Sequence, residues 1–157
     1  TPFKESPVLS ISCHIFFAFS CFILISYNNF LMIKNVKANE CFNILKAEES
    51  SRLIDVRTSH EWQNDGYADL KSIGKKVHLI SLTNDDHSPS INFTNQINDL
   101  GIKPENKIFF VCRSGIRSLH AANLLSEDFI TKEIFNVEGG MEYGWKHLDL
   151  PIFYKGN

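Results

Sequence analysis

One cysteine in the chain is followed by a run of small, polar and cationic residues. Cys112 comes directly after the apolar residues 108–111 and opens the string Cys112-Arg113-Ser114-Gly115-Ile116-Arg117-Ser118. A strand that ends in a cysteine and turns into a helix places the thiol where backbone N–H groups and the positive helix end converge. Such a setting favours the reactive thiolate form. The pattern therefore predicts a cysteine nucleophile.

The alternative is that Cys112 is a buried, inert cysteine at the end of a core strand, because free cysteines are often buried. The residues after it argue against this, since only Ile116 among the next six is a large apolar residue. Such a segment is better suited to binding an anion. We expect Arg113 to project to the mouth of the site. Arg117 either joins it there or ties the loop to a carboxylate such as Asp55.

Other polar residues are expected to support the site or to lie outside it. Asp55 is expected to pair locally at a strand end, and Arg57 and Glu61, four residues apart, are expected to form an ion pair. The run 119–125 is helix-like, with Leu119, Ala122 and Leu125 as its buried stripe and His120 on the surface beside it. Cys41 fits a core position on a helix.

Length and composition limit the function classes. The chain has 157 residues and a net charge of −2 from 16 Lys and Arg against 18 Asp and Glu. This length suits one catalytic domain, and the even charge balance argues against a nucleic-acid partner. The four cysteines show no CxxC or Cys/His spacing. We therefore expect no metal site, no cofactor and a reducing compartment.

The N-terminal segment differs from the rest of the chain. Residues 8–33 contain no Asp, Glu, Lys or Arg, and residues 15–25 are densely apolar. We interpret residues 1–33 either as a membrane anchor, through residues 8–31 only, or as a non-native extension with translation starting at Met32. If the segment is an anchor, Lys34 and Lys37 on its C-terminal side outnumber Lys4 on its other side, which places the domain in the cytoplasm. Both interpretations therefore predict a cytoplasmic domain over residues 34–157.

From residue 33 onward, short apolar runs alternate with helix-like segments. Strands are expected over residues 33–36, 53–56, 77–82, 108–111 and 134–137, and helices over 41–45, 59–62, 91–100, 119–125 and 141–147. This alternation predicts an α/β domain with a parallel sheet, whose ligands bind at the carboxyl ends of the strands. Asp55 and Cys112 lie at such ends. Residues 83–89 are expected to form a surface loop.

Several motifs together resemble those of the rhodanese-like domain family. They are Ile54-Asp55-Val56-Arg57 with Glu61-Trp62 and Gly66, the cysteine loop, Val137-Glu138-Gly139-Gly140-Met141, Gly144-Trp145 and Leu150-Pro151. In this order they cover residues 34 to 153. One departure is Tyr67-Ala68-Asp69, where the family often has His-Ile-Pro.

The resemblance to single-domain rhodaneses implies a five-stranded parallel sheet flanked by helices on both faces. It also implies sulfurtransferase activity, in which Cys112 carries a persulfide between a small anionic donor such as thiosulfate and a thiol or cyanide acceptor. The loop that surrounds the sulfur would be Arg113, Ser114, Gly115, Ile116 and Arg117. Asp55, Arg57 and Ser118 would support it.

Two other functions remain open. Cysteine-dependent phosphatases also combine a cysteine, an amide-lined loop and an arginine, but their loop is one residue longer than the Cys-x4-Arg spacing from Cys112 to Arg117. A shorter loop suits one sulfur atom better than a phosphoryl group. The second alternative is a non-enzymatic rhodanese-like regulatory or interaction module, for which loss of the cysteine is the usual sign.

Overall fold

The computed structural model describes residues 33–126 and 133–155. The predicted anchor or extension, residues 1–33, lies almost wholly outside the described residues. The boundary expected after residue 33 lies at their start. Within the described residues, no helix combines the length and apolar character needed to cross a membrane.

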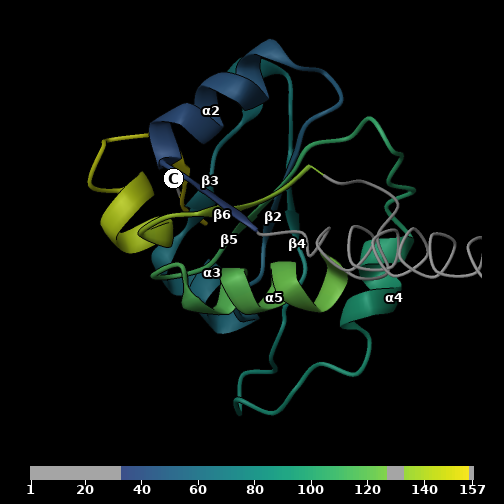
Figure 1. Ribbon diagram of the computed structural model, residues 1–157. Helices are drawn as coiled ribbons and strands as arrows, with labels where there is room; N and C mark the ends of the chain where they lie inside the picture. The colour runs from purple at the N-terminus through teal and green to yellow at the C-terminus, as the bar shows by residue number, and fades with distance from the viewer. Residues whose placement is uncertain (1–32, 127–132, 156–157) are drawn as a thin grey trace, which may run out of the picture. The chain divides into compact units, whose positions relative to one another are not determined.

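A five-stranded parallel sheet forms the centre of the domain (Figure 1). Its strand order is β1-β6-β5-β2-β4, with bounds Lys34–Val36, Ile134–Val137, Ile108–Val111, Arg52–Asp55 and Val77–Leu79. The register pairs Asp55 of β2 with Val111 of β5. The carboxyl ends of these neighbouring strands therefore meet at one edge of the sheet, where Cys112 follows.

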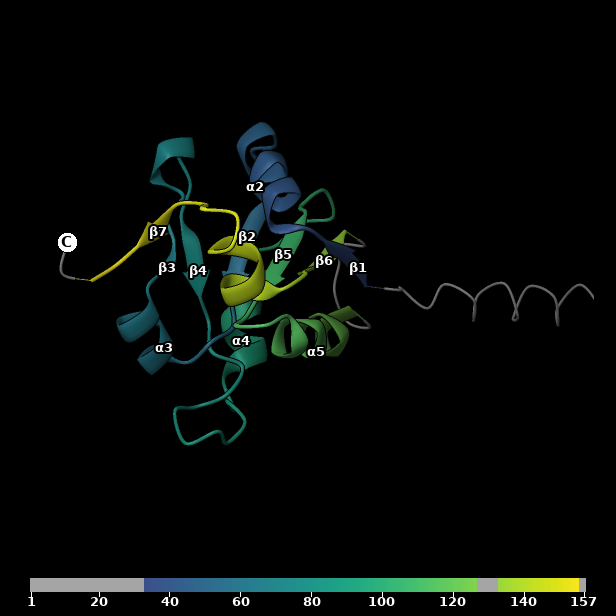
Figure 2. The same ribbon diagram turned by 90° about the vertical axis from the view of Figure 1, so that its left-hand side faces the viewer.

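Helices cover both faces of this sheet, which confirms the predicted fold class. On one face lie α4 (Phe93–Asn98) and α5 (Ile116–Ser126), and on the other lie α2 (Ala38–Ala47) and the π-helix η2 (Gly140–Trp145) (Figure 2). The central strand β5 supplies both cores. Ile108 and Phe110 pack with α4 and α5, while Phe109 and Val111 pack with α2 and η2. This alternation follows from the two-residue period of a strand.

Helix α5 begins earlier than the sequence pattern suggested. It starts at Ile116 and buries Ser118, Ala121, Ala122 and Leu125. The expected placement of Leu119 in the buried stripe is wrong, because that side chain is 37% exposed and lies one position beside the stripe that these residues define. His120 is exposed, as predicted.

The segment that departs from the family pattern makes a small second sheet. Strand β3 (Tyr67–Ala68) pairs antiparallel with β7 (Ile152–Phe153). Gly66 precedes this pair with φ of 70°, and a Cβ there would lie 2.5 Å from the Phe153 carbonyl oxygen. Only glycine fits this close approach, so Gly66 lets the chain turn from α3 (Ser59–Asp65) into the pair.

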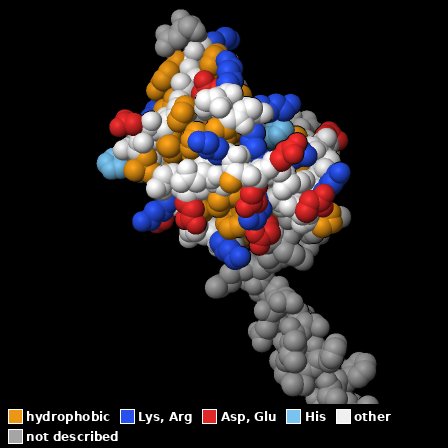
Figure 3. All heavy atoms as spheres, turned by 90° about the horizontal axis from the view of Figure 1, so that it is seen from above, with side chains coloured by type: hydrophobic (Ala, Val, Ile, Leu, Met, Phe, Trp, Pro, Cys, Tyr) orange, Lys and Arg blue, Asp and Glu red, His pale blue; other side chains and the backbone are white. Residues whose placement is uncertain are grey.

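The remaining described elements lie near the edge strand β4. The 3-10 helix η1 (Lys71–Ile73) leads into β4, and residues 83–89 form the predicted loop, closed by a bridge between Thr83 and Pro89. On the face shown in Figure 3, acidic and basic side chains are interspersed among hydrophobic ones. This mixture agrees with the small net charge of −2.

Candidate active site

Cys112 lies where β5 ends and the loop into α5 begins. The residue is only 1% exposed, and its Sγ accepts a hydrogen bond from the backbone N–H of Gly115 at 3.1 Å. Helix α5 starts at the next residue, Ile116. A donated N–H and a helix N-terminus both stabilise negative charge on sulfur. The predicted surroundings of Cys112 are therefore present.

Backbone hydrogen bonds attach the cysteine loop to the turn that contains Gly139 and Gly140. The N–H of Met141 donates to the Cys112 carbonyl at 2.7 Å, and the N–H of Glu142 donates to the Arg113 carbonyl at 2.9 Å. Gly140 has φ of 56°, and a Cβ there would lie 2.6 Å from the carbonyl carbon of Arg113. The absence of a side chain at Gly140 therefore lets this turn approach the cysteine loop.

The other end of the loop is tied down by an ion pair between Arg117 and Glu61. The two guanidinium nitrogens of Arg117 donate to the two carboxylate oxygens of Glu61 at 2.7 and 2.6 Å. Glu61 also accepts from the backbone N–H of Thr58, and Thr58 accepts from the N–H of Glu61 in a capping box at the start of α3. The loop is thus fixed to the start of a second helix.

This pairing alters the pKa values of both partners. Partial burial raises the pKa of Glu61, but the hydrogen bonds from Arg117 and Thr58 outweigh it and lower the pKa below its ordinary value. The hydrogen bonds to Glu61 raise the pKa of Arg117, and the nearby charges of Cys112 and Asp55 act in the same direction. Arg117 is therefore a cation held in place by Glu61.

The structure corrects the expected pair between Arg57 and Glu61, and it shows which carboxylate ties Arg117 and the loop down. Arg117 binds Glu61 rather than Asp55, and Arg57 binds Asp55 rather than Glu61. Arg57 follows Asp55 by two residues at the end of β2, so its side chain folds back onto the Asp55 carboxylate at 2.8 Å. It also donates to the Gly66 carbonyl at 2.7 Å. Both side chains are buried, which confirms that Asp55 pairs locally.

A cavity of about 540 Å³ lies beside the loop. Its lining residues come from α3, the 83–89 loop and the cysteine loop: Thr58, His60, Glu61, Asp85, His87, Arg113 and Arg117. Arg113 is exposed at this cavity, as expected. Asp85 accepts from the N–H of His60 at 3.1 Å and from the Ser59 hydroxyl at 2.8 Å, so the 83–89 loop is attached to the start of α3.

Sequence reasoning missed the part of this cavity that comes from outside the cysteine loop. Residues 83–89 were expected only as a surface loop, so neither His87 nor Asp85 was assigned to the site, and His60 was not assigned to it either. No local pattern marks them, because only the tertiary fold brings this loop to α3. Within the cysteine loop, Ser114 is partly buried and Ile116 is 75% exposed.

A buried polar chain lies behind the cysteine, and the sequence analysis assigned only its first member. The Ser118 hydroxyl oxygen is 3.3 Å from Cys112 Sγ and 2.6 Å from Asn136 Oδ1. Asn136, from β6, donates through Nδ2 to Asn35 Oδ1 at 2.9 Å. Ser118 and Asn136 are both buried. Ser118 therefore supports the cysteine directly, as predicted.

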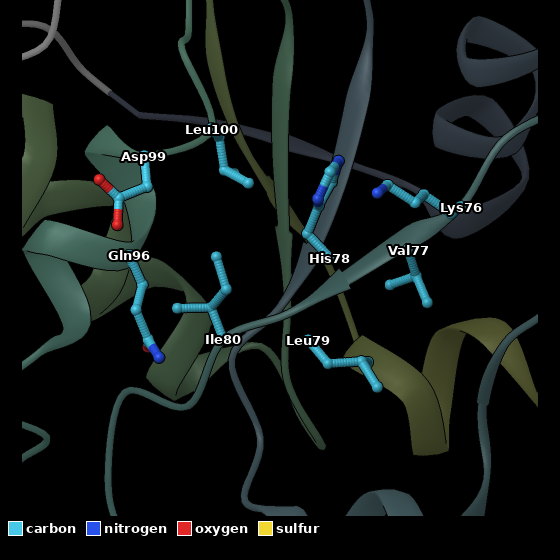
Figure 4. Close-up of a pocket in the computed structure, with 8 residues that line it drawn as sticks. All are labelled: Lys76, Val77, His78, Leu79, Ile80, Gln96, Asp99 and Leu100. Atoms are coloured by element: carbon cyan, nitrogen blue, oxygen red, sulfur yellow. The ribbon is translucent and has the colours of Figure 1, made fainter.

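A second cavity, of about 480 Å³, lies along the edge strand β4 (Figure 4). His78 and Ile80 face it from the strand segment, and Gln96 and Asp99 lie opposite on and just after α4. Burial, together with the charges of Lys76 and Arg52, lowers the pKa of His78 below its ordinary value. No residue of the cysteine loop lines this cavity, so it is separate from the candidate site. Among residues 33–126 and 133–155, no three His, Cys, Asp or Glu side chains form a metal-binding group.

The sequence of this chain is similar to those of one known protein family. The model of the rhodanese-like domain matches residues 38–147. The chain belongs to the rhodanese-like domain family. An uncharacterized protein of Rickettsia rickettsii is 34% identical over 126 residues, which cover 77% of this chain and 98% of that protein.

Solved structures show the same fold. The M. tuberculosis protein Rv0390 has a TM-score of 0.71 at 28% identity, covering 78% of this chain and 98% of its own. The polysulfide-sulfur transferase homodimer of Wolinella succinogenes has a TM-score of 0.64 at 22% identity, covering 90% of this chain and 92% of its own. A Rhodopseudomonas palustris protein named as a possible tyrosine phosphatase has a TM-score of 0.54 at 18% identity, covering 97% and 100%. At these identities the last two establish the fold alone.

Proposed function

We propose that this rhodanese-like protein is a sulfurtransferase that carries a sulfane sulfur as a persulfide on Cys112. The observation that carries the proposal is the position of Cys112 Sγ. It accepts the Gly115 N–H at 3.1 Å at the N-terminus of α5, in a loop fixed by Gly140 on one side and by Glu61 on the other. Rigid donors around one sulfur atom are what an anionic sulfur intermediate needs.

In the first step, the Cys112 thiolate attacks the outer sulfur of a donor such as thiosulfate. A new S–S bond forms to Cys112, the S–S bond of thiosulfate breaks, and sulfite leaves with the electron pair. The product is the Cys112 persulfide anion, in which the outer sulfur carries the charge. No proton has to be transferred, so the step needs no general base.

In the second step, an acceptor thiolate or cyanide attacks the outer sulfur of the persulfide. The electron pair of the Cys112 S–S bond returns to Cys112 as its thiolate, and the acceptor leaves as a persulfide or as thiocyanate. The Gly115 N–H and the end of α5 stabilise the sulfur anion before and after transfer. The enzyme is thereby restored without a cofactor.

The cavity beside the loop suits small anionic reactants. Arg113 is exposed there and provides a cation for an approaching donor, whereas Arg117 is held by Glu61. The cavity has a volume of about 540 Å³, which is within the range of small-molecule sites, so an acceptor larger than cyanide fits. We infer that the partners are a small anionic donor and a small-molecule or protein thiol, and that the domain works in the cytoplasm.

The decisive experiment is to measure intact mass before and after a sulfur donor is added. We expect the mass of one sulfur atom to be gained from thiosulfate or from polysulfide, located on Cys112 by peptide mass spectrometry, and lost when cyanide is added. Sulfite release distinguishes thiosulfate from polysulfide as the donor. If neither donor leaves sulfur on Cys112, the proposal is wrong.

An aryl phosphate assayed in parallel tests the phosphatase alternative. With four residues between Cys112 and Arg117, the loop should be too small to surround three phosphoryl oxygens. We expect negligible phosphate release from the native protein, and reduced sulfur transfer after one Gly is inserted behind Gly115. Turnover of the phosphate on the order of 1 per second would favour the phosphatase instead.

A further inference from the structure

The hydrogen-bonded chain behind Cys112 contains one hydroxyl between two acceptors. The Ser118 oxygen lies 2.6 Å from Asn136 Oδ1 and 3.3 Å from Cys112 Sγ. A serine hydroxyl has a single hydrogen, so it cannot be donated to the amide oxygen and to a sulfur anion at once. The shorter distance assigns it to Asn136 in the structure.

The orientation of Asn136 is fixed by its other end. Its Nδ2 donates to Asn35 Oδ1 at 2.9 Å, so its Oδ1 faces Ser118. With the Ser118 hydrogen directed at Asn136, the Ser118 oxygen presents lone pairs to Cys112. Lone pairs suit a thiol, which can donate its S–H, and they do not suit a sulfur anion.

We propose that Asn136 is a positioning residue for Cys112, which competes with the sulfur for the Ser118 hydrogen. While Cys112 is a thiol, Asn136 holds that hydrogen. When the sulfur becomes an anion, the Ser118 hydroxyl turns from Asn136 to Sγ. The inference rests on the proposed function only in taking Cys112 as the reacting group.

The charged groups around the cysteine are separate from the hydrogen-bonded residues Ser118, Asn136 and Asn35. Arg117 of α5 is held by Glu61 of α3 and acts on Cys112 only through its charge. Asp55 and Arg57 pair with each other at the end of β2, and Arg113 lies at the cavity. The side-chain hydrogen bonds of Ser118 and Asn136 go to Cys112, to each other and to Asn35, so substitutions at these two positions should leave the charged side chains in place. A changed titration of Cys112 in such variants therefore reports on the hydroxyl.

The test is the pH midpoint of thiolate formation in the full chain. The ultraviolet absorbance of each variant is compared with that of the same variant carrying Cys112→Ser, which isolates Cys112 from the other cysteines. Asn136→Leu removes the competing acceptor, so the midpoint should fall by about one pH unit, a tenfold change in the thiolate-to-thiol ratio. Ser118→Ala removes the donor, so the midpoint should rise.

The double variant Ser118→Ala/Asn136→Leu is the sharpest measurement. Because Asn136 acts through Ser118, the double variant should titrate like Ser118→Ala alone. An unchanged midpoint in Asn136→Leu, or the same fall with and without Ser118, would overturn the proposal.

Two further variants keep the test interpretable. Asn35→Ala releases the outer end of the hydrogen-bonded series at an exposed residue, and should lower the midpoint by less than a folded Asn136→Leu does. If Asn136→Leu fails to fold, an unchanged midpoint in Asn35→Ala would overturn the proposal in its place. Asn123→Leu, at an exposed position of α5, is the matched control and should titrate like the native chain. Thiolate formation requires no sulfur transfer, so this inference and the proposed function can fail separately.

Discussion

Cys41 and Cys112 are equally buried, at 0% and 1% exposed, but their surroundings differ. Cys41 lies in α2 within the core, where burial, with the charge of Glu40 added, raises the pKa of its thiol well above the ordinary value. The Cys112 Sγ instead accepts a hydrogen bond from the Gly115 N–H, has the Ser118 hydroxyl beside it and lies within the electrostatic influence of Arg117. We therefore expect the donors and charges around each thiol, and not burial alone, to decide which of the two reacts.

Exchanging each cysteine for serine tests this comparison most directly. Cys112→Ser should lower sulfur transfer by about a thousandfold or more, because a hydroxyl is a much weaker nucleophile at neutral pH. Cys41→Ser should leave transfer nearly unchanged and cost about 1–3 kcal/mol of stability, because it buries a hydroxyl in the core. Sulfite release and denaturant unfolding measure the two effects. Substantial turnover by the Cys112→Ser protein would exclude Cys112 as the nucleophile.

The donor geometry at Cys112 depends on the close approach of Gly140. Gly140→Ala should lower activity about a hundredfold and stability by roughly 3 kcal/mol, because its Cβ would collide with the backbone of Cys112 and Arg113.

Gly74→Ala is the matched control for that substitution. Gly74 has φ of 69° but nothing within 4 Å of a Cβ, so its cost should be only the roughly 1 kcal/mol of a left-handed alanine. Chemical denaturation and sulfur-transfer rates separate the two. Equal losses in both variants would show that backbone conformation, and not contact with the cysteine loop, sets the requirement for glycine.

The ion pair at the far end of the loop should have an intermediate and pH-dependent effect. Glu61→Gln should lower activity roughly tenfold, because Arg117 loses its charged partner, and stability by about 1 kcal/mol at neutral pH for this partly exposed pair.

The sign of the pH dependence follows from the lowered pKa of Glu61. The carboxylate stabilises the fold above its unfolded pKa of about 4.3, and that stability is lost as pH falls through the lower folded pKa. The stability difference between native and Glu61→Gln proteins should therefore vanish in acid. A difference that is independent of pH would mean that packing, not charge, carries the effect.

Arg113 should give the smallest effect, because it is exposed at the cavity and does not hold the loop. Arg113→Ala should raise the KM for thiosulfate by a few-fold with little change in kcat, and the difference should shrink as salt rises. Steady-state rates at low and high ionic strength measure this. A large fall in kcat at unchanged KM would instead mean that Arg113 stabilises the transition state.

Features encoded locally were predicted well from the sequence. The alternation of apolar and helical runs predicted the five parallel strands, and the string after Cys112 predicted a loop at the N-terminus of a helix. The ion pair between Arg57 and Glu61 was assigned wrongly, because helical spacing was applied where Arg57 precedes the helix and folds back onto Asp55.

Residues contributed by distant segments could not be predicted. His87 and Asp85 reach the cavity only because their loop is bonded to the start of α3, and Asn136 meets Ser118 only when β6 has paired beside β5. Such contacts depend on tertiary pairing, which leaves no periodic pattern in one chain.

The strand order also determines when the site can form during synthesis. Cys112 leaves the ribosome before β6, yet β6 joins β1 to β5, and the Gly139-Gly140 turn that holds the cysteine loop follows β6. Pairing of segments so distant along the chain is a late event in folding. A nascent chain therefore contains the proposed nucleophile well before it contains the geometry of the cysteine loop, so we expect sulfur transfer to require that synthesis has passed the turn.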